Sequence, residues 1–203
     1  MELEPIVESK VIIVEGGDDK NLLTALAKHI GLSGIQIISS EGKKHKLSTV
    51  IDAVRKTPDF ANKVNTLGVA VDADTNACGA FESVQDALKR ADLSVPQEPL
   101  TIVEGPPRII IMIWPCDKNQ GKLEDVCLQS VTDCVEMTCV NKYFECLGQQ
   151  NIESPHNMAK AKAQTFLAAK PETYPKVGVA ALKGYWPFDN EAFDKIKDFL
   201  RKL

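Results

Sequence analysis

Acidic residues follow two apolar segments that lie far apart in the chain. Glu15 comes directly after the run 11–14, and Asp72 and Asp74 come after the run 67–71. Continuous apolar runs of this length are typical of strands in a parallel sheet that helices cover on both faces. Ligands of such sheets bind at the carboxyl ends of the strands. We therefore expect Glu15, Asp72 and Asp74 to share one edge of a sheet.

Three carboxylates at one edge repel each other unless a cation lies between them. Oxygen ligands of this kind suit the hard divalent ions Mg²⁺ and Mn²⁺. Asp19 and Glu124 are further candidate metal ligands. Helix capping is the alternative for each of them, because Asp18 or Asp19 can cap a first helix and Glu124 and Asp125 open a later one, where the helix dipole favours acids.

The two acidic motifs resemble those of the Toprim domain, which occurs in topoisomerases, DnaG-type primases, RecR and OLD-family nucleases. That domain has V-E-G-x-x-D after its first strand and D-x-D after a later one. Here the motifs read VEGGDD at 14–19 and DAD at 72–74, and the spacing of 57 positions from Glu15 to Asp72 leaves room for one strand and helix. The resemblance covers residues 10–115. It implies that Glu15 is a general acid or base and that Asp72 and Asp74 hold a divalent metal.

The whole chain is also similar to small Toprim-like proteins related to the OLD nucleases. Two later segments carry this second resemblance, GKLED at 121–125 and GYW at 184–186. It implies that Glu124 is a further metal ligand. We interpret residues 184–188 as a packing corner for the last helix, with stacking on a nucleobase as the alternative.

Composition limits the class of protein. The chain has 203 residues, 44% hydrophobic and 26% charged, which is average for a soluble globular domain. Its longest apolar run is far below the ~20 residues that span a bilayer, and its acidic start has no apolar core like that of a secretory signal. We expect a cytoplasmic protein with no membrane partner.

The lysines that could contact nucleic acid are concentrated in a few loops. The formal net charge of −4 argues against a protein that binds nucleic acid over its whole surface. Lys43, Lys44 and Lys46 lie in the loop after the second predicted strand, on the same edge as Glu15, and Lys118 lies in the loop after the last. We interpret them as candidate phosphate-binding residues, with a solvated charged turn as the alternative. Lys122 is a further loop lysine that could contact phosphate.

The chain has six cysteines but no C-x-x-C pair. Two pairs of them are spaced seven residues apart, which places each pair on one helix face. Such spacing is typical of small core residues in helices, and the close ligand pairs of a structural zinc site are missing. We expect reduced cysteines without metal, and a zinc site is the alternative.

The predicted fold class is α/β, a Toprim-like Rossmannoid parallel sheet core with helices on both faces and a C-terminal helical extension. We divide the chain into a core, 1–121, and an extension, 122–203, packed together as one globular unit. The predicted strands are 10–14, 35–38, 67–71, and a hairpin of 100–103 with 108–114. The predicted helices are one from 18 or 19 to 30, then 47–57, 80–92, 123–134, 135–148, 156–169 and 190–202.

These features predict a Mg²⁺- or Mn²⁺-dependent phosphoryl-transfer enzyme acting on DNA or RNA, most simply a nuclease. The alternative is a Toprim-fold module that binds metal and nucleic acid, or a protein partner, without catalysis. The chain shows no tyrosine domain of a topoisomerase, no zinc domain of a primase and no ATPase of a full OLD protein. A separate protein partner is therefore a further expectation, while the sequence leaves the oligomeric state open.

Overall fold

The structure is a computed structural model, and it describes residues 4–40, 46–174 and 176–203. Strands and helices alternate through the first half of the chain and helices follow. In chain order the elements are β1 (Lys10–Val14), α1 (Gly17–His29), β2 (Ile35–Ser39), α2 (Leu47–Arg55), α3 (Pro58–Lys63), β3 (Thr66–Asp72), α4 (Ala77–Arg90), β4 (Ile102–Val103), β5 (Arg108–Trp114), α5 (Leu123–Gln129), α6 (Val135–Gln149), α7 (Met158–Ala168), α8 (Val177–Leu182), the 3-10 turn η2 (Glu191–Phe193) and α9 (Asp194–Lys202).

The strands form one sheet in the order β2-β1-β3-β5-β4. All neighbouring pairs are parallel except β4 and β5, which form the predicted antiparallel hairpin. Six of the seven residues of β3 are buried, as its continuous apolar run requires in a sheet that is covered on both faces. The predicted α/β class with a mainly parallel sheet is confirmed.

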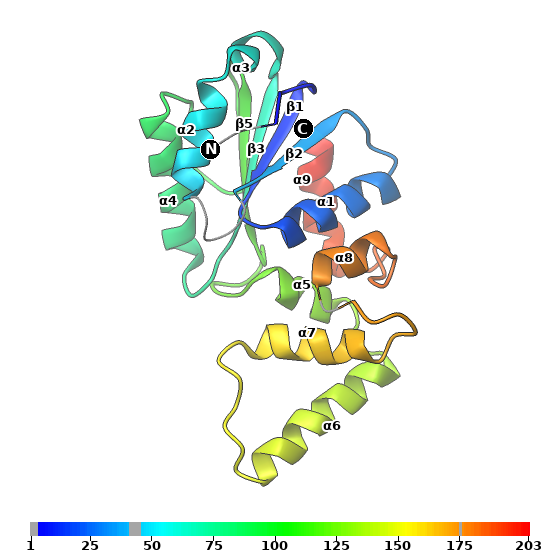
Figure 1. Cartoon of the computed structure of the whole chain (residues 1–203). Helices are drawn as coiled ribbons and strands as arrows, with labels where there is room; N and C mark the ends of the chain where they lie inside the picture. The colour runs from blue at the N-terminus through cyan, green and yellow to red at the C-terminus, as the bar shows by residue number, and fades with distance from the viewer. Residues whose placement is uncertain (1–3, 41–45, 175) are drawn as a thin grey trace.

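Successive side chains of each strand pack alternately into two apolar cores, one on each face of the sheet. Ile12 and Val14 of β1 pack with α1, α5, α8 and α9, whereas Val11 and Ile13 pack with α2 and α4. Figure 1 shows α2 and α4 on one side of the sheet and α1, α8 and α9 on the other. The period-two alternation of a strand is the physical reason for the two cores.

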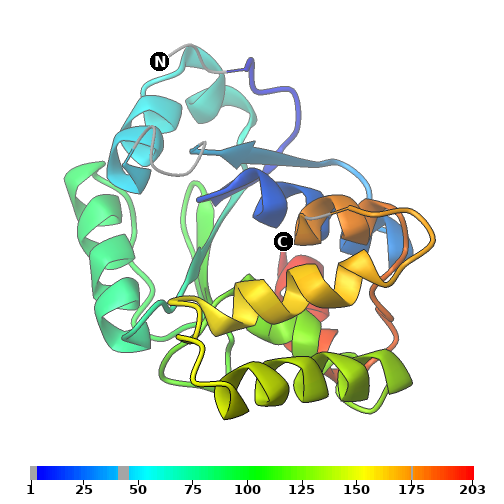
Figure 2. The same cartoon turned by 60° about the horizontal axis from the view of Figure 1, so that its bottom comes forward.

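The helices α5, α6 and α7 lie beyond the carboxyl ends of the strands (Figures 1 and 2), and buried residues of all three belong to the same core as Ile12 and Val14. The segment 184–186 anchors this part of the chain to α8. Trp186 is 2% exposed, its ring stacks on Phe166 of α7 at 5.5 Å, and its Nε1 donates to the Val177 carbonyl oxygen at 2.9 Å. This segment is therefore a packing corner, with the indole ring inside the core.

Local capping explains where the elements differ from their predicted bounds. α4 begins at Ala77 rather than at 80, because the Asn76 side chain accepts a hydrogen bond from the Gly79 amide at 3.2 Å. Pro58 does more than end a helix, because it also occupies the first turn of α3. The short α8 was not predicted, since six residues carry too little periodicity to indicate a helix.

All six cysteines are free. Cys127 is fully buried in the core, but the expectation of core positions is wrong for Cys139 and Cys146, which are exposed on α6. In the described parts of the chain, no helix combines the length and the apolar character that crossing a membrane would need.

Candidate metal and phosphate site at the carboxyl edge of the sheet

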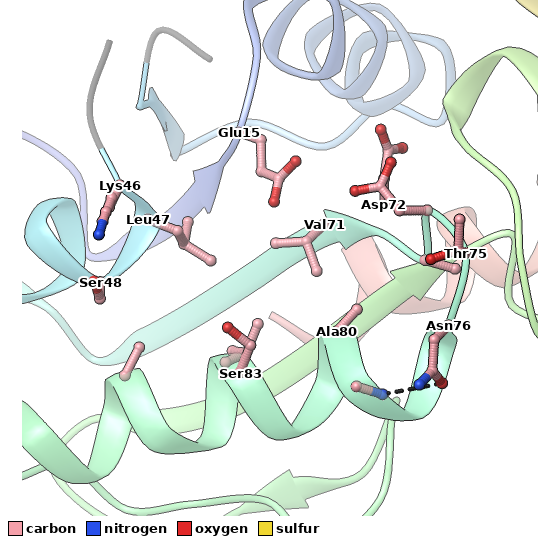
Figure 3. Close-up of a pocket in the computed structure, with 15 residues that line it drawn as sticks. Glu15, Lys46, Leu47, Ser48, Val71, Asp72, Thr75, Asn76, Ala80 and Ser83 are labelled. Carbon is pink, nitrogen blue, oxygen red and sulfur yellow. Dashed lines mark hydrogen bonds between the residues drawn. The ribbon is translucent and has the colours of Figure 1, made fainter. Parts of the chain in front are cut away.

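The first two acids of the site are placed by the register of β1 and β3. Val14 pairs with Ala70, so Glu15 directly follows the last paired residue of β1 and Asp72 ends the adjacent strand two residues further on. Figure 3 shows both carboxyl groups over the same pocket, each coming from a strand end. The predicted convergence of Glu15 and Asp72 at one edge is what the sheet produces.

The start of α1 adds a third acid. Asp19 is only 8% exposed, and its Oδ2 accepts a hydrogen bond from the Gly16 amide at 2.7 Å. The neighbouring Asp18 side chain contacts α8 instead, where its Oδ1 accepts a hydrogen bond from the Gly178 amide at 3.1 Å. Asp19 therefore caps its own helix and also belongs to the acidic site, whereas Asp18 ties α1 to α8.

The start of α5 is bonded directly to both aspartates of the DAD motif. Asp72 Oδ1 accepts from the Leu123 amide at 2.9 Å, and the Asp74 carbonyl oxygen accepts from the Gly121 amide at 2.8 Å. Gly121 has φ +133°, a conformation that side chains rarely adopt. Asp125 Oδ2 accepts from the Lys122 amide at 2.8 Å. Asp125 thus has the capping role of the predicted pair, which leaves Glu124 beside the acids.

The acids raise one another's proton affinity. Burial, followed by the charge of Asp72, raises the pKa of Asp19 to about 8. Burial also raises the pKa of Asp72 to about 7, helped by the charges of Glu15 and Glu124 and opposed by the Leu123 amide and Lys122. Burial and then the charge of Asp74 raise the pKa of Glu15. Asp19 and Asp72 therefore keep their protons to much higher pH than an isolated aspartate does, which limits the negative charge of the metal-free cluster near neutral pH.

Asp74 already has a cationic partner. The Lys122 ammonium pairs with Asp74 Oδ1, and this hydrogen bond is the main reason that the pKa of Lys122 is raised. Within residues 4–40, 46–174 and 176–203, no three His, Cys, Asp or Glu side chains are grouped so that they could hold a metal ion. In this conformation the acids thus do not form a closed metal cage.

Two clefts meet at Asp74. The first measures about 500 Å³, and we call it the carboxylate cleft. In Figure 3 Glu15 lies over it between Lys46 on one side and Asp72 on the other. The second, here the lysine cleft, measures about 800 Å³. Its lining is mostly polar and includes Asp74, Lys118, Lys122, Asp125, His156 and Asn157. Of the predicted phosphate-binding residues, Lys46 and Lys118 each line a cleft, while Lys43 and Lys44 lie outside the described residues.

A sequence family described as "Protein of unknown function (DUF3226)" matches residues 9–203. The chain belongs to this family. Among solved structures, the C-terminal region of the Xanthomonas campestris pv. campestris OLD protein aligns with a TM-score of 0.52 and 15% identity, over 96% of this chain and 91% of that one. The C-terminal region of the Burkholderia pseudomallei OLD protein aligns with a TM-score of 0.54 and 14% identity, over 97% and 98%. A search of curated proteins finds no match.

Of the two predicted resemblances, these comparisons support the one to OLD proteins. The likeness to two OLD C-terminal regions agrees with the OLD relationship, and at 14–15% identity it shows a common fold. The Toprim assignment itself rests on the VEGGDD and DAD motifs.

Sequence reasoning missed two features of the site. The first is the pairing of Lys122 with Asp74, which are 48 residues apart. The second is that His156 and Asn157, at the start of α7, line the lysine cleft beside the core loop 118–122. One sequence feature pointed to this turn. Asp125 lies three residues after Lys122, which is the spacing between the residue that caps a helix start and the acid that bonds back to its amide. That signal locates the turn but does not indicate where the lysine side chain points.

The pKa shift of Asp19 predicts how stability depends on pH in the metal-free protein. Its folded pKa lies above the unfolded value, so its contribution is fully present below about pH 4 and is lost as pH rises through about 8. Asp19→Asn should therefore raise the melting temperature at pH 8.5 by about 4–8 °C, from about 2 kcal/mol, and leave it nearly unchanged near pH 4. Thermal melts in chelator would check this, and an equal difference at both pH values would contradict it.

Proposed function

We propose that this protein is a Mg²⁺- or Mn²⁺-dependent phosphoryl-transfer enzyme that acts on nucleic acid, most simply a nuclease. The observation that carries the proposal is the group of acids at one sheet edge, the buried Asp19 and the half-buried Glu15 and Asp72, whose pKa values are all raised. Raised pKa values with a stated physical cause are a marker of functional sites. The fold shared with OLD C-terminal regions and the Toprim motifs support the same chemistry.

The donor chemistry fits a hard divalent ion. All the acids offer oxygen, and Mg²⁺ commonly uses only one or two carboxylates and keeps several waters. Two of the acids would therefore suffice, even though no three described side chains form a closed group. A bound divalent ion would cancel charge on the attacked phosphate and on the leaving oxygen. We assign Asp72 and Asp74 as principal ligands, with Asp19 and Glu124 as additional ones.

The remaining residues would act on the proton and on the phosphates. Glu15 has a raised pKa at the rim of the carboxylate cleft, which suits a general acid or base. Lys46 at one cleft and Lys118 at the other would contact phosphates on either side of the acids. This arrangement would lead a strand of DNA or RNA across Asp74, where the two clefts meet.

One observation favours the alternative, a module that binds nucleic acid or a protein partner without catalysis. Asp74 is already paired with Lys122, and Asp72 already accepts from the Leu123 amide. Both metal-ligand candidates therefore have partners in the absence of metal, as they would in a purely structural site.

Metal binding tests the site. Calorimetric titration with Mn²⁺ should show binding to the wild type and an affinity lower by about tenfold or more in Asp72→Asn, because one charged ligand is lost. Asp52→Asn is the matched control, since Asp52 pairs with Lys56 on the surface of α2. If wild type and Asp72→Asn bind Mn²⁺ equally well, the proposed metal site is wrong.

Catalysis is tested by incubating the purified protein with plasmid, single-stranded DNA and RNA in the presence of Mg²⁺ or Mn²⁺. Cleavage that stops in chelator is the expected result. Metal binding without cleavage of any of these substrates would favour the non-catalytic module.

A further inference from the structure

Lys122 lies where a bound cation would otherwise neutralise the acids. Its ammonium pairs with Asp74, and its charge lowers the pKa of both Glu15 and Asp72. The charges of Asp72 and Glu124 in turn add to the rise in its own pKa. One lysine thus faces carboxylates from four places in the chain: directly after β1, the end of β3, the segment after β3, and α5.

The backbone of Lys122 is held by hydrogen bonds, while its side chain is partly exposed. Its amide donates to Asp125, and the preceding Gly121 amide donates to the Asp74 carbonyl oxygen. The side chain is 37% exposed and reaches Asp74 from the wall of the lysine cleft. A lysine ammonium on a flexible four-carbon stem can change partner without any change of backbone.

The lysine cleft has room for a second partner of this ammonium. Lys118 and His156 also line it, so a phosphate there would meet groups able to donate hydrogen bonds. Asp74 lines both clefts, which places the exchange of partners at their junction.

We propose that Lys122 is a resident counter-ion that exchanges between two partners, Asp74 in the metal-free protein and a nucleic-acid phosphate in the lysine cleft once a divalent cation holds Asp74. The proposal rests on the proposed function, because it concerns the same acids. Its consequence is that divalent metal and nucleic acid bind cooperatively. Each would strengthen the other by the same factor, as thermodynamic linkage requires.

The first experiment compares Mn²⁺ affinity, by calorimetry, in wild type, Lys122→Gln and Lys118→Gln. Lys122→Gln should bind Mn²⁺ about fivefold more tightly or better, because no ammonium competes for Asp74. Lys118→Gln removes the same charge from the same cleft. Among the described residues Lys118 forms no ion pair with an acid, so this variant should change the affinity less than twofold. An equal increase in Mn²⁺ affinity in both variants would mean that any lost positive charge near the acids has this effect. That result would overturn the exchange of partners.

Two further outcomes separate this proposal from the proposed function. If wild type and Lys122→Gln bind Mn²⁺ equally well, the exchange is wrong while the metal site stands. If neither binds Mn²⁺, both proposals fall. Lys122→Gln keeps the backbone bonds of residue 122, so a thermal melt close to that of wild type is expected.

The second experiment measures cooperativity directly. Fluorescence anisotropy of labelled single-stranded DNA and RNA oligonucleotides, with Ca²⁺ or with chelator, gives the ratio of the two affinities. The affinity for the oligonucleotide with Ca²⁺, divided by the affinity in chelator, should be about fivefold or more in wild type and close to one in Lys122→Gln. In Lys118→Gln this ratio should be the same as in wild type. A ratio in Lys122→Gln that equals the wild-type ratio, or no binding of either oligonucleotide by wild type, would overturn the exchange.

Discussion

Replacing Glu15 with glutamine is expected to lower the rate of nucleic-acid cleavage by about 100-fold or more, while Mn²⁺ still binds. A glutamine side chain fills the same space but cannot take up or release a proton, and a positioned general acid or base contributes about 10²–10⁴-fold. The position is well defined, because the Ser40 hydroxyl donates to the Glu15 carbonyl oxygen at 2.8 Å and holds the end of β1. The raised pKa of Glu15 brings its titration closer to neutral pH.

The rate is measured by single-turnover cleavage of whichever substrate the wild type cuts, with Mn²⁺ calorimetry on the same samples. Glu8→Gln is the matched control, because Glu8 precedes β1 at the opposite end of the sheet, where its amide donates to Gln36 Oε1. Loss of cleavage together with loss of Mn²⁺ binding would make Glu15 a metal ligand instead. Full activity in Glu15→Gln would remove it from the mechanism.

Gly178→Ala should lower the free energy of unfolding by about 3 kcal/mol or more, which corresponds to a melting temperature lower by about 6–12 °C for a chain of this size. A Cβ atom at this position would lie 2.4 Å from the Asp18 carbonyl oxygen and 2.5 Å from its Cα. Both are backbone atoms of α1, so they cannot move aside as the end of a side chain would. The added methyl group would force α8 away from α1 and break the bond from the Gly178 amide to Asp18.

Gly148→Ala is the matched control for this change. Gly148 lies within α6, and a Cβ there meets no atom within 4 Å. The same chemical substitution should therefore stabilise the protein by about 0.5–1 kcal/mol, because alanine is the better helix former. Thermal and urea unfolding of both variants would check the pair. A stability of Gly178→Ala equal to wild type would mean that α8 does not pack on α1 as the structure has it.

Much of the sheet followed from local sequence. Runs such as 11–14 and 67–71 are apolar at every position, which suits strands with both faces buried and does not suit a half-exposed strand. Parallel pairing then brings their carboxyl ends to one edge whatever the details of packing, so Glu15 and Asp72 could be placed together from the sequence. The ends of the helices were harder to predict, since a single side chain such as Asn76 shifts a helix start by three residues.

The chemistry around the acids was decided by contacts between distant segments. Residues 121–125 reach the acids only because β5 carries the chain back to the same edge. There the Leu123 amide, the Lys122 ammonium and Asp125 find partners that no local spacing specifies. The lysine cleft likewise needs the start of α7 to lie beside the loop 118–122. Sequence by itself thus determined which acids share an edge, since strand direction is a local property. Only the tertiary structure decided which amide, ammonium or carboxylate each acid meets, because those contacts depend on how the later helices pack onto that edge.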